Sequence, residues 1–136
     1  MKKVFLDANI ILDFLDSSRS AHKKVRKLFG LLIEQDYRPV ISEDILTTIY
    51  YIVKDKAAVL GFFDHILSQW ELVCLGIDTI EQAVKLCREN STLDFEDVCQ
   101  ALAAKKAGCE VVITNDAEFF RPDGVTLYQA HEFLSG

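Results

Sequence analysis

Residues 3–15 of this 136-residue chain read KVFLDANIILDFL, where a short apolar run passes directly into an amphipathic segment. The run from Lys3 to Leu6 predicts a buried β-strand, and Asn9 to Leu15 predicts a helical turn. Asp7 stands between them. An acid at that point lies at the carboxyl end of a strand, which is where open α/β sheets bind their ligands.

The rest of the chain repeats this alternation of apolar runs and amphipathic segments. Further strands are expected at Pro39 to Ile41, Glu71 to Leu75, Glu110 to Thr114 and Val125 to Tyr128. Helices are expected from Ala21 to Gln35, after Ser42, around Phe62, around Ala83, from Asp94 to Gly108 and at the end of the chain. Strands separated by helices imply right-handed crossovers. The sequence therefore predicts a three-layer α/β/α fold with a mostly parallel central sheet.

Two of the expected helices carry more detailed predictions. Ser42 is expected to cap the third helix, with Glu43 and Asp44 in its first turn, where the helix dipole favours acids. The periodicity of the helix around Ala83 predicts that Ile80 and Val84 point inward.

Composition restricts the class of protein. Half of the residues are hydrophobic and 26% are charged, which is a globular balance. The length predicts a single domain that spans residues 1–136. No apolar run approaches the roughly 20 residues of a membrane helix, and the apolar stretch before Asp7 is too short for a secretory signal. We therefore expect a cytoplasmic protein that does not enter membranes.

Cysteine and histidine do not explain a functional site. The four cysteines are scattered without CxxC spacing, each in an apolar segment, and the three histidines are isolated from one another. A structural zinc site or a histidine acid–base pair is therefore not supported. Any chemistry must come from carboxylates.

Four aspartates from distant parts of the chain are predicted to meet at one edge of the sheet. Asp7 and Asp116 follow expected strands, and side chains that leave neighbouring strand ends can converge. Asp94 and Asp97 lie three residues apart at a helix start, so they share one face. Each acid also has a local explanation, as a helix cap or a turn former. Such local roles do not explain why separate acids map to one edge.

A cluster of carboxylates favours a bound cation. Mutual repulsion makes such a cluster costly, and hard oxygen ligands select Mg²⁺ or Mn²⁺ over softer metals. A divalent cation generates a nucleophile from water near neutral pH and stabilises a leaving oxygen, which suits phosphodiester hydrolysis. The four aspartates thus predict an acidic metal site that cuts a nucleic acid.

Three segments of the chain resemble a known family. VFLDANIILD at 4–13, LDFEDVCQALAAKKAG at 93–108 and VVITNDAEFF at 111–120 are similar, in this order and spacing, to the PIN domain, a nuclease fold that includes VapC-type toxins. The resemblance spans the whole chain. It implies RNA as the substrate, cleavage to 5′-phosphate and 3′-hydroxyl ends, and a homodimer.

The resemblance also assigns roles to the four acids. Asp7 matches the family's first metal ligand, Asp97 the acid inside the helix motif, and Asp116 the acid after the fourth strand. Asp94 is similar to the additional acid of the DFED variant of that motif. We therefore expect Asp7, Asp97 and Asp116 to hold Mg²⁺ or Mn²⁺, with Asp94 as a further ligand or as a base that orients water.

One position departs from the family pattern. Many PIN domains carry a glutamate in the helix after the second strand, and Thr48 occupies that position here. Glu43 lies earlier in the same segment and is a candidate replacement, although a first-turn acid is explained equally well by the helix dipole. The segment TTIYYI is similar to a PIN subgroup with small polar residues there, so the change need not abolish activity.

Charge restricts how RNA is bound. The net charge is −6 and the isoelectric point is about 5.0, whereas phosphate contacts require lysine or arginine. Residues 22–27, HKKVRK, give one helix a basic stripe. We interpret this stripe as a solvated helix face and not as an RNA groove.

The sequence predicts a metal-dependent endoribonuclease, and as a further hypothesis the toxin of a toxin–antitoxin pair. A separate antitoxin would then cover the acidic cleft with basic side chains. One alternative is a catalytically inactive PIN-fold module that binds RNA or a protein partner, suggested by Thr48. A second is a haloacid-dehalogenase-like phosphatase, which needs another acid two residues after the strand-end aspartate, where this chain has Asn9.

Overall fold

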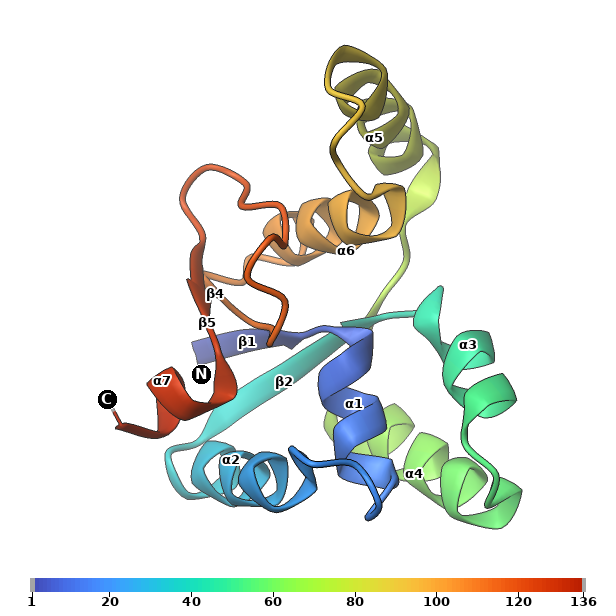
Figure 1. Cartoon of the computed structure of the whole chain (residues 1–136), viewed down its shortest axis with the longest axis vertical. Helices are drawn as coiled ribbons and strands as arrows, with labels where there is room; N and C mark the ends of the chain where they lie inside the picture. Colours follow the sequence, from blue (N-terminus) through green and yellow to red (C-terminus); the bar gives the residue numbers. More distant parts are fainter. Residues whose placement is uncertain (1, 136) are drawn as a thin grey trace.

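The computed structural model describes residues 2–135, which form a parallel sheet with helices on both faces (Figure 1). The elements in chain order are β1 (Lys2–Leu6), α1 (Ala8–Leu15), α2 (His22–Glu34), β2 (Tyr37–Ser42), α3 (Ile45–Ile52), α4 (Lys56–Gln69), β3 (Glu71–Val73), α5 (Gly76–Glu89), α6 (Phe95–Lys106), β4 (Val111–Ile113), β5 (Thr126–Tyr128) and α7 (Ala130–Ser135). The five strands have the order β3-β2-β1-β4-β5. The predicted α/β/α fold is confirmed. None of the helices between residues 2 and 135 combines the length and apolarity needed to cross a bilayer.

Strand β1 occupies the centre of the sheet and pairs in parallel with β2 on one side and β4 on the other. Phe5 is in register with Val40 of β2 and with Val112 of β4. The chain builds the sheet outward from β1 in both directions, so the strand order reverses between β1 and β4. Open α/β sheets bind ligands beyond the carboxyl ends of the strands at such a point.

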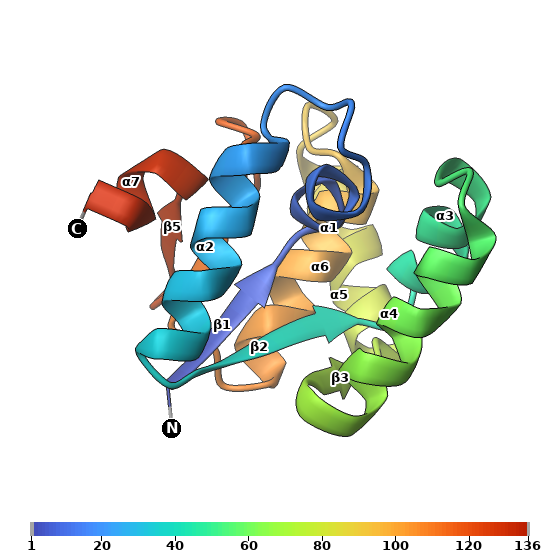
Figure 2. The same ribbon diagram turned by 90° about the horizontal axis from the view of Figure 1, so that it is seen from below.

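The side chains of β1 alternate between the two faces of the sheet. Val4 and Leu6 pack in the larger core with α1, α2, α3 and α4, whereas Phe5 packs against α6 on the other face. Figure 2 shows α2 and α6 on opposite sides of the strands. The sheet is therefore buried on both faces, as parallel sheets require.

Helix α5 does not touch the sheet but packs on α6 (Figure 1). Its buried Ala83 joins a small core with Val98, Cys99 and Leu102 of α6. Because α5 packs mainly on α6, its apolar face is partly covered, and Ile80 and Val84 are 42% and 38% exposed. The prediction that these two side chains point inward was wrong.

The end of β2 also differs from the prediction. Ser42 is the last residue of the strand and does not cap a helix, because the Glu43 backbone N–H continues the pairing with β3 by donating to the Val73 carbonyl at 2.9 Å. Helix α3 begins at Ile45, and Asp44 precedes it without a side-chain capping bond. Glu43 and Asp44 therefore lie outside the first turn where the sequence placed them.

Helix α6 ends at Lys106, and Gly108, two residues on, adopts the left-handed conformation that the sequence predicted for the stop. Gly108 has φ +85°, and its N–H donates to the Lys105 carbonyl at 3.0 Å. The Cys109 N–H donates to the Ala104 carbonyl, also at 3.0 Å. This left-handed residue turns the chain toward β4, and Asp116 follows that strand.

Two glycine substitutions should change stability in opposite directions. A Cβ at Gly108 or at Gly61 would meet no atom within 4 Å, so neither substitution creates a clash. Gly108→Ala places a Cβ in a left-handed residue and should lower the free energy of unfolding by about 1 kcal/mol. Gly61→Ala, inside α4, should raise it by roughly 0.5–1 kcal/mol. Denaturant unfolding measures both values, and a common sign for the two would contradict this account.

Candidate active site

Asp7 is fixed at the junction of β1 and α1. Its side chain is 3% exposed, and both carboxylate oxygens accept a hydrogen bond. Oδ1 accepts from the backbone N–H of Ile10 at 3.0 Å, so Asp7 caps α1. Oδ2 accepts from the Thr114 hydroxyl at 2.5 Å, which ties Asp7 to the end of β4. Asp7 is thus both the N-cap of α1 and an acid at the edge of the sheet.

The Thr114 hydroxyl connects Asp7 with the segment that carries Asp116. Its oxygen accepts from the Asp116 backbone N–H at 3.1 Å while its proton is donated to Asp7. Thr114 is 2% exposed. Asp116 Oδ1 accepts from the Glu118 N–H at 2.9 Å and stabilises a turn, and no helix follows β4 at this point. Sequence reasoning missed Thr114 because its role depends on the pairing of β1 with β4.

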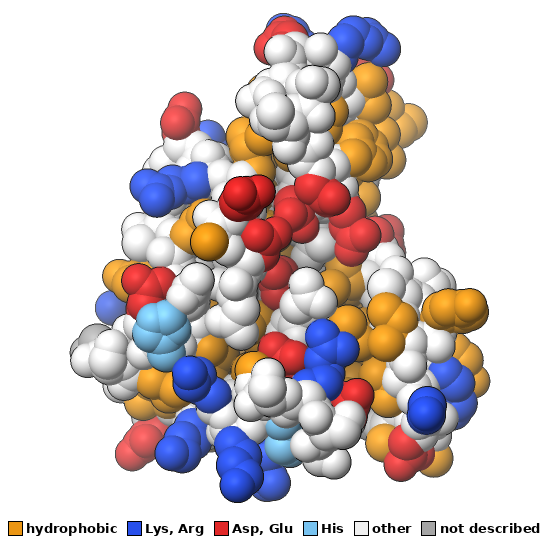
Figure 3. All heavy atoms as spheres, in the orientation of Figure 1, with side chains coloured by type: hydrophobic (Ala, Val, Ile, Leu, Met, Phe, Trp, Pro, Cys, Tyr) orange, Lys and Arg blue, Asp and Glu red, His pale blue; other side chains and the backbone are white. Residues whose placement is uncertain are grey.

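The start of α6 supplies the other two acids. Asp94 Oδ1 accepts from the Asp97 backbone N–H at 3.0 Å, so Asp94 is the N-cap of this helix, as its local pattern suggested. Asp97 lies in the first turn and is half-buried. Figure 3 shows acidic side chains gathered in one patch over α6, below α5.

The pKa values indicate that these acids lie close to one another. Burial raises the pKa of Asp97 to about 7, and the charges of Asp94, Asp116 and Asp7 add to the effect. Burial also raises the pKa of Asp7 to about 6, with smaller contributions from Asp116 and Asp13, against hydrogen bonds from Thr114 and Ile10 that lower it. All four predicted residues are thus brought to one end of the sheet.

No lysine or arginine between residues 2 and 135 forms an ion pair with the four aspartates of this patch. In residues 2–135 the ion pairs join Lys3 to Glu71 and Arg19 to Asp13, and neither pair includes any of the four aspartates. The raised pKa values of Asp7 and Asp97 express the resulting electrostatic cost. A bound divalent cation would remove that cost.

The donor set fits a hard cation, although the acids do not stand in a finished ligand shell. Within the described part of the chain no three acidic, histidine or cysteine side chains are placed so that they could hold one ion as they stand. The available donors are carboxylate oxygens, which suit Mg²⁺ or Mn²⁺. Asp7, Asp97 and Asp116 are the residues that would hold such an ion, with Asp94 beside them.

The two acids near the end of β2, Glu43 and Asp44, have different surroundings. Glu43 is exposed, and its carboxylate accepts a hydrogen bond from the Cys74 thiol, whose pKa it raises. Burial raises the pKa of Glu96 in α6, and the charge of Asp44 adds to this effect, so Asp44 lies in the neighbourhood of Glu96. Thr48 is half-buried within α3. Asp44 and Glu96 therefore adjoin the site, and sequence reasoning assigned neither of them to it.

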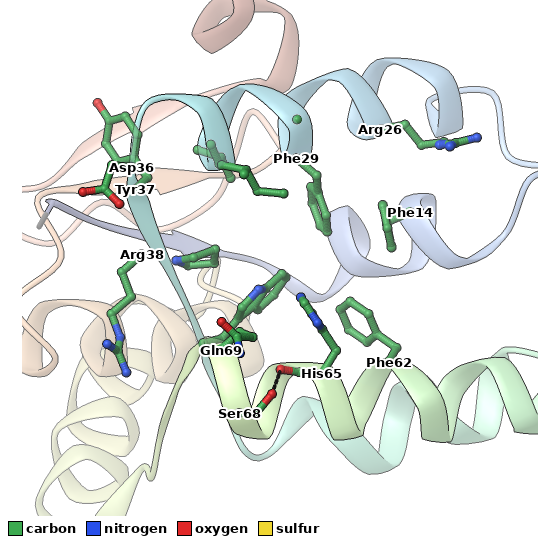
Figure 4. A pocket seen from close by; sticks show the side chains of 15 residues that line it. Phe14, Arg26, Phe29, Asp36, Tyr37, Arg38, Phe62, His65, Ser68 and Gln69 are labelled. Carbon is green, nitrogen blue, oxygen red and sulfur yellow. Dashed lines mark hydrogen bonds between the residues drawn. The ribbon is translucent and has the colours of Figure 1, made fainter.

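A cavity of about 920 Å³ lies elsewhere, between α2 and α4 (Figure 4). Aromatic side chains line it, including Phe29, Phe62 and Trp70, and Arg38 of β2 is among its residues. Residues at the beginning of β2 form one wall, so the cavity lies toward the amino end of a strand whose carboxyl end faces the aspartates. It is not part of the acidic site.

Comparisons with known proteins agree with this fold. A family model described as the PIN domain matches residues 3–118. A curated relative, Ribonuclease VapC1 from Aquifex aeolicus, is 32% identical over 125 residues, and the match covers 90% of this chain and 87% of the relative.

Solved structures of low sequence identity share the fold. VapC20 from Mycobacterium tuberculosis, described as a sarcin-ricin loop cleaving toxin, matches with a TM-score of 0.72 at 15% identity, over 88% of this chain and 99% of that one. DNA-bound VapBC from Salmonella typhimurium matches with a TM-score of 0.68 at 22% identity, over 96% of this chain and 99% of that one.

Replacing Asp7 with asparagine should change stability in a pH-dependent manner. The folded protein raises the pKa of Asp7 from 3.8 to about 6, so ionisation of this residue opposes folding. The penalty is absent below about pH 4 and complete above about pH 7. In EDTA, Asp7→Asn should therefore be more stable than the wild type at pH 8, by at most roughly 3 kcal/mol, with the difference vanishing toward pH 4.

Denaturant unfolding between pH 4 and pH 8 measures this difference. The exposed Asp64→Asn on α4 is the matched control and should give a constant difference across the range. If Asp7→Asn is less stable than the wild type at every pH in EDTA, burial of the charge is not the dominant effect at this position.

Proposed function

The chain belongs to the PIN domain family, and on this premise we propose that it is an endoribonuclease that depends on Mg²⁺ or Mn²⁺. The observation that carries the proposal is the convergence of Asp7, Asp97 and Asp116 from separate segments at the edge between β1 and β4. Burial raises the pKa values of Asp7 and Asp97, and the neighbouring acids add to the effect, in the direction that a bound cation would reverse.

The protein positions each acid through its own backbone and side chains. Thr114 and the Ile10 N–H hold the Asp7 carboxylate, and Thr114 also accepts from the Asp116 backbone. Asp94 uses one oxygen to cap α6, so its second oxygen is free to orient water or to serve as a ligand. A divalent cation at this site would stabilise negative charge on the phosphodiester that is cut.

These observations affect the two alternative functions, the phosphatase and the inactive binding module, in different ways. The phosphatase alternative loses its basis, because the family model and the curated relative are both of the PIN type and Asn9 replaces the acid such enzymes need. The inactive binding module rests on Thr48, which provides no carboxylate from α3. Asp44 and Glu96 place two further acids at the same end of α6, so the loss at Thr48 does not leave this flank neutral.

The similarity to VapC proteins suggests a toxin. The curated relative is a VapC ribonuclease, and several of the solved structures with this fold come from VapBC complexes. As a toxin, the protein would act on RNA in the cytoplasm, as a monomer or a homodimer. An antitoxin would inhibit it by covering the acidic patch with basic side chains, because none of the ion pairs among the described residues includes the four aspartates.

RNA cleavage tests the enzymatic proposal. Purified protein with Mn²⁺ should cut single-stranded RNA, and EDTA should stop the reaction. Asp97→Asn should lower the rate roughly 100-fold or more, because a carboxylate ligand is lost. Asp64→Asn, an exposed acid on α4, should cut like the wild type. Gel analysis of end-labelled RNA measures the rates. Absence of RNA cleavage by the wild type with every divalent ion tested would favour the inactive binding module.

Growth of a bacterial host tests the toxin proposal. Induced expression of the wild type should arrest growth, because unregulated RNA cleavage stops protein synthesis. Expression of Asp97→Asn at an equal protein level should not, since it keeps the fold but loses a catalytic carboxylate. Optical density and immunoblotting measure the two quantities. Equal arrest by both proteins would show that toxicity does not come from the acidic site.

A further inference from the structure

The connection between α1 and α2 holds an arginine in a fixed orientation. Arg19 Nε donates to Asp13 Oδ1 at 2.8 Å, and the Asp13 side chain is only 10% exposed. In residues 2–135 the two terminal NH₂ groups of Arg19 donate to no other protein atom, and its side chain is 35% exposed. Asp16, the nearest acid in the sequence, instead accepts from the Ser18 N–H and hydroxyl. A buried carboxylate thus holds one edge of the guanidinium and leaves its other donors to solvent.

Helix α1 places Arg19 near the proposed metal site. Asp7 caps the beginning of α1, and Asp13 lies six residues further along the same helix. Six helical residues span about 9 Å, so the guanidinium that contacts Asp13 lies on the order of 10 Å from Asp7. His22 Nδ1 donates to the Asp13 carbonyl at 2.9 Å, which joins the first residue of α2 to the same end of α1.

Helix α2 continues the positive charge beyond Arg19. Residues 17–33 include five lysines and arginines and no aspartate or glutamate, although the net charge of the chain is −6. Lys23, Lys24 and Lys27 are exposed, and none of the ion pairs in residues 2–135 includes them. This part of the protein is therefore strongly basic within an acidic molecule.

The three lysines lie away from the aromatic cavity between α2 and α4. Arg26 lines that cavity, and Lys24, two residues earlier, points in nearly the opposite direction, because two helical residues turn by roughly 200°. Figure 3 shows lysine and arginine side chains over α2 on the same face of the molecule as the acidic patch. A basic stripe by itself is explained as a solvated helix face. That explanation does not account for an arginine held by a buried acid between the stripe and the aspartates.

We propose that Arg19, Lys23, Lys24 and Lys27 form a basic track that binds the phosphate backbone of single-stranded RNA on one side of the cleaved bond. The planar fork of Arg19 would bind one phosphate through its two free NH₂ groups. The lysines would bind the following phosphates as point charges. The proposal rests on the proposed ribonuclease function, because RNA is the ligand that it assumes.

The acidic site requires positive charge nearby if RNA is to bind there. The four aspartates repel the phosphate backbone, and one divalent cation offsets only part of their charge. Contacts between phosphates and lysine or arginine supply affinity without reading the bases. The basic track is therefore expected to determine how tightly RNA binds and in which direction the strand leaves the aspartates, and not which bases are recognised.

Binding of RNA without cleavage tests the basic track. The parent protein is Asp97→Asn, and the probe is a fluorescein-labelled single-stranded RNA of about 12 nucleotides in buffer with Mg²⁺. Fluorescence anisotropy measures the association constant K at several salt concentrations. Lys23→Gln, Lys24→Gln and Lys27→Gln together should weaken binding about tenfold or more at low salt. They should also reduce the slope of log K against log salt by about 2, because each lost phosphate contact with a single strand removes about 0.7.

A variant with the same change in charge is the matched control. Lys2→Gln, Arg38→Gln and Lys105→Gln together remove three positive charges from exposed residues at the starts of β1 and β2 and at the end of α6. These residues lie toward the amino ends of the strands, far from the aspartates. The control should keep the salt slope of the parent, because charges that do not contact the RNA are screened by salt.

Arg19 is tested together with its partner. Arg19→Gln alone would leave Asp13 as an unpaired buried charge and lower stability. The double variant Asp13→Asn, Arg19→Gln removes both charges, and it should melt close to the parent but bind RNA several-fold more weakly. Its salt slope should fall by about 0.7. Structural damage would lower the fraction of protein that binds without changing this slope.

The proposal is overturned if the parent binds no RNA, or if the lysine variant and its control lose affinity and salt slope equally. Binding of a glutamate-rich peptide in place of RNA would assign this surface to a protein partner and would also overturn it. Absence of RNA cleavage by a wild type that binds RNA through these residues would count against the proposed ribonuclease activity alone.

Discussion

The hydrogen bond between the Thr114 hydroxyl and the Asp7 carboxylate joins the carboxyl ends of the two strands on which the site depends. The same hydroxyl accepts from the Asp116 backbone, so one buried side chain sets the positions of both strand-end acids. This arrangement requires β1 and β4 to be adjacent and in register, with Leu6 opposite Ile113. The sheet order is therefore the constraint from which the geometry of the site follows.

The same geometry opposes folding. Burial raises the pKa values of Asp7 and Asp97, neighbouring acids add to both effects, and the described residues provide no ion pair to any member of this group. The protein retains this unfavourable electrostatic arrangement although the amide oxygen of an asparagine at position 7 could still cap α1 by accepting from the Ile10 N–H. Unfavourable interactions that the fold tolerates are typical of functional sites, where binding of a ligand restores the lost free energy.

The sequence was sufficient for features that depend on local periodicity or on strand ends. The strand before Asp7, the stop at Gly108 and the four aspartates at one edge were all predictable in this way. Features that depend on neighbours in space were not. Ile80 and Val84 are exposed because α5 meets α6 and not the sheet, and Glu43 lies before the first turn of α3 because β2 extends through Ser42 to pair with β3. No periodicity encodes which neighbour an element will have.

Local and functional roles of the aspartates are compatible because a carboxylate has two oxygens, each with two lone pairs. Asp94 caps α6 with one oxygen, and Asp7 caps α1 with one oxygen while the other accepts from Thr114. Capping restricts the rotamer of each side chain, so it fixes the direction in which the remaining lone pairs point. A helix cap at the edge of the sheet is thus a means of orienting a ligand, and a local explanation for such an acid does not count against a catalytic one.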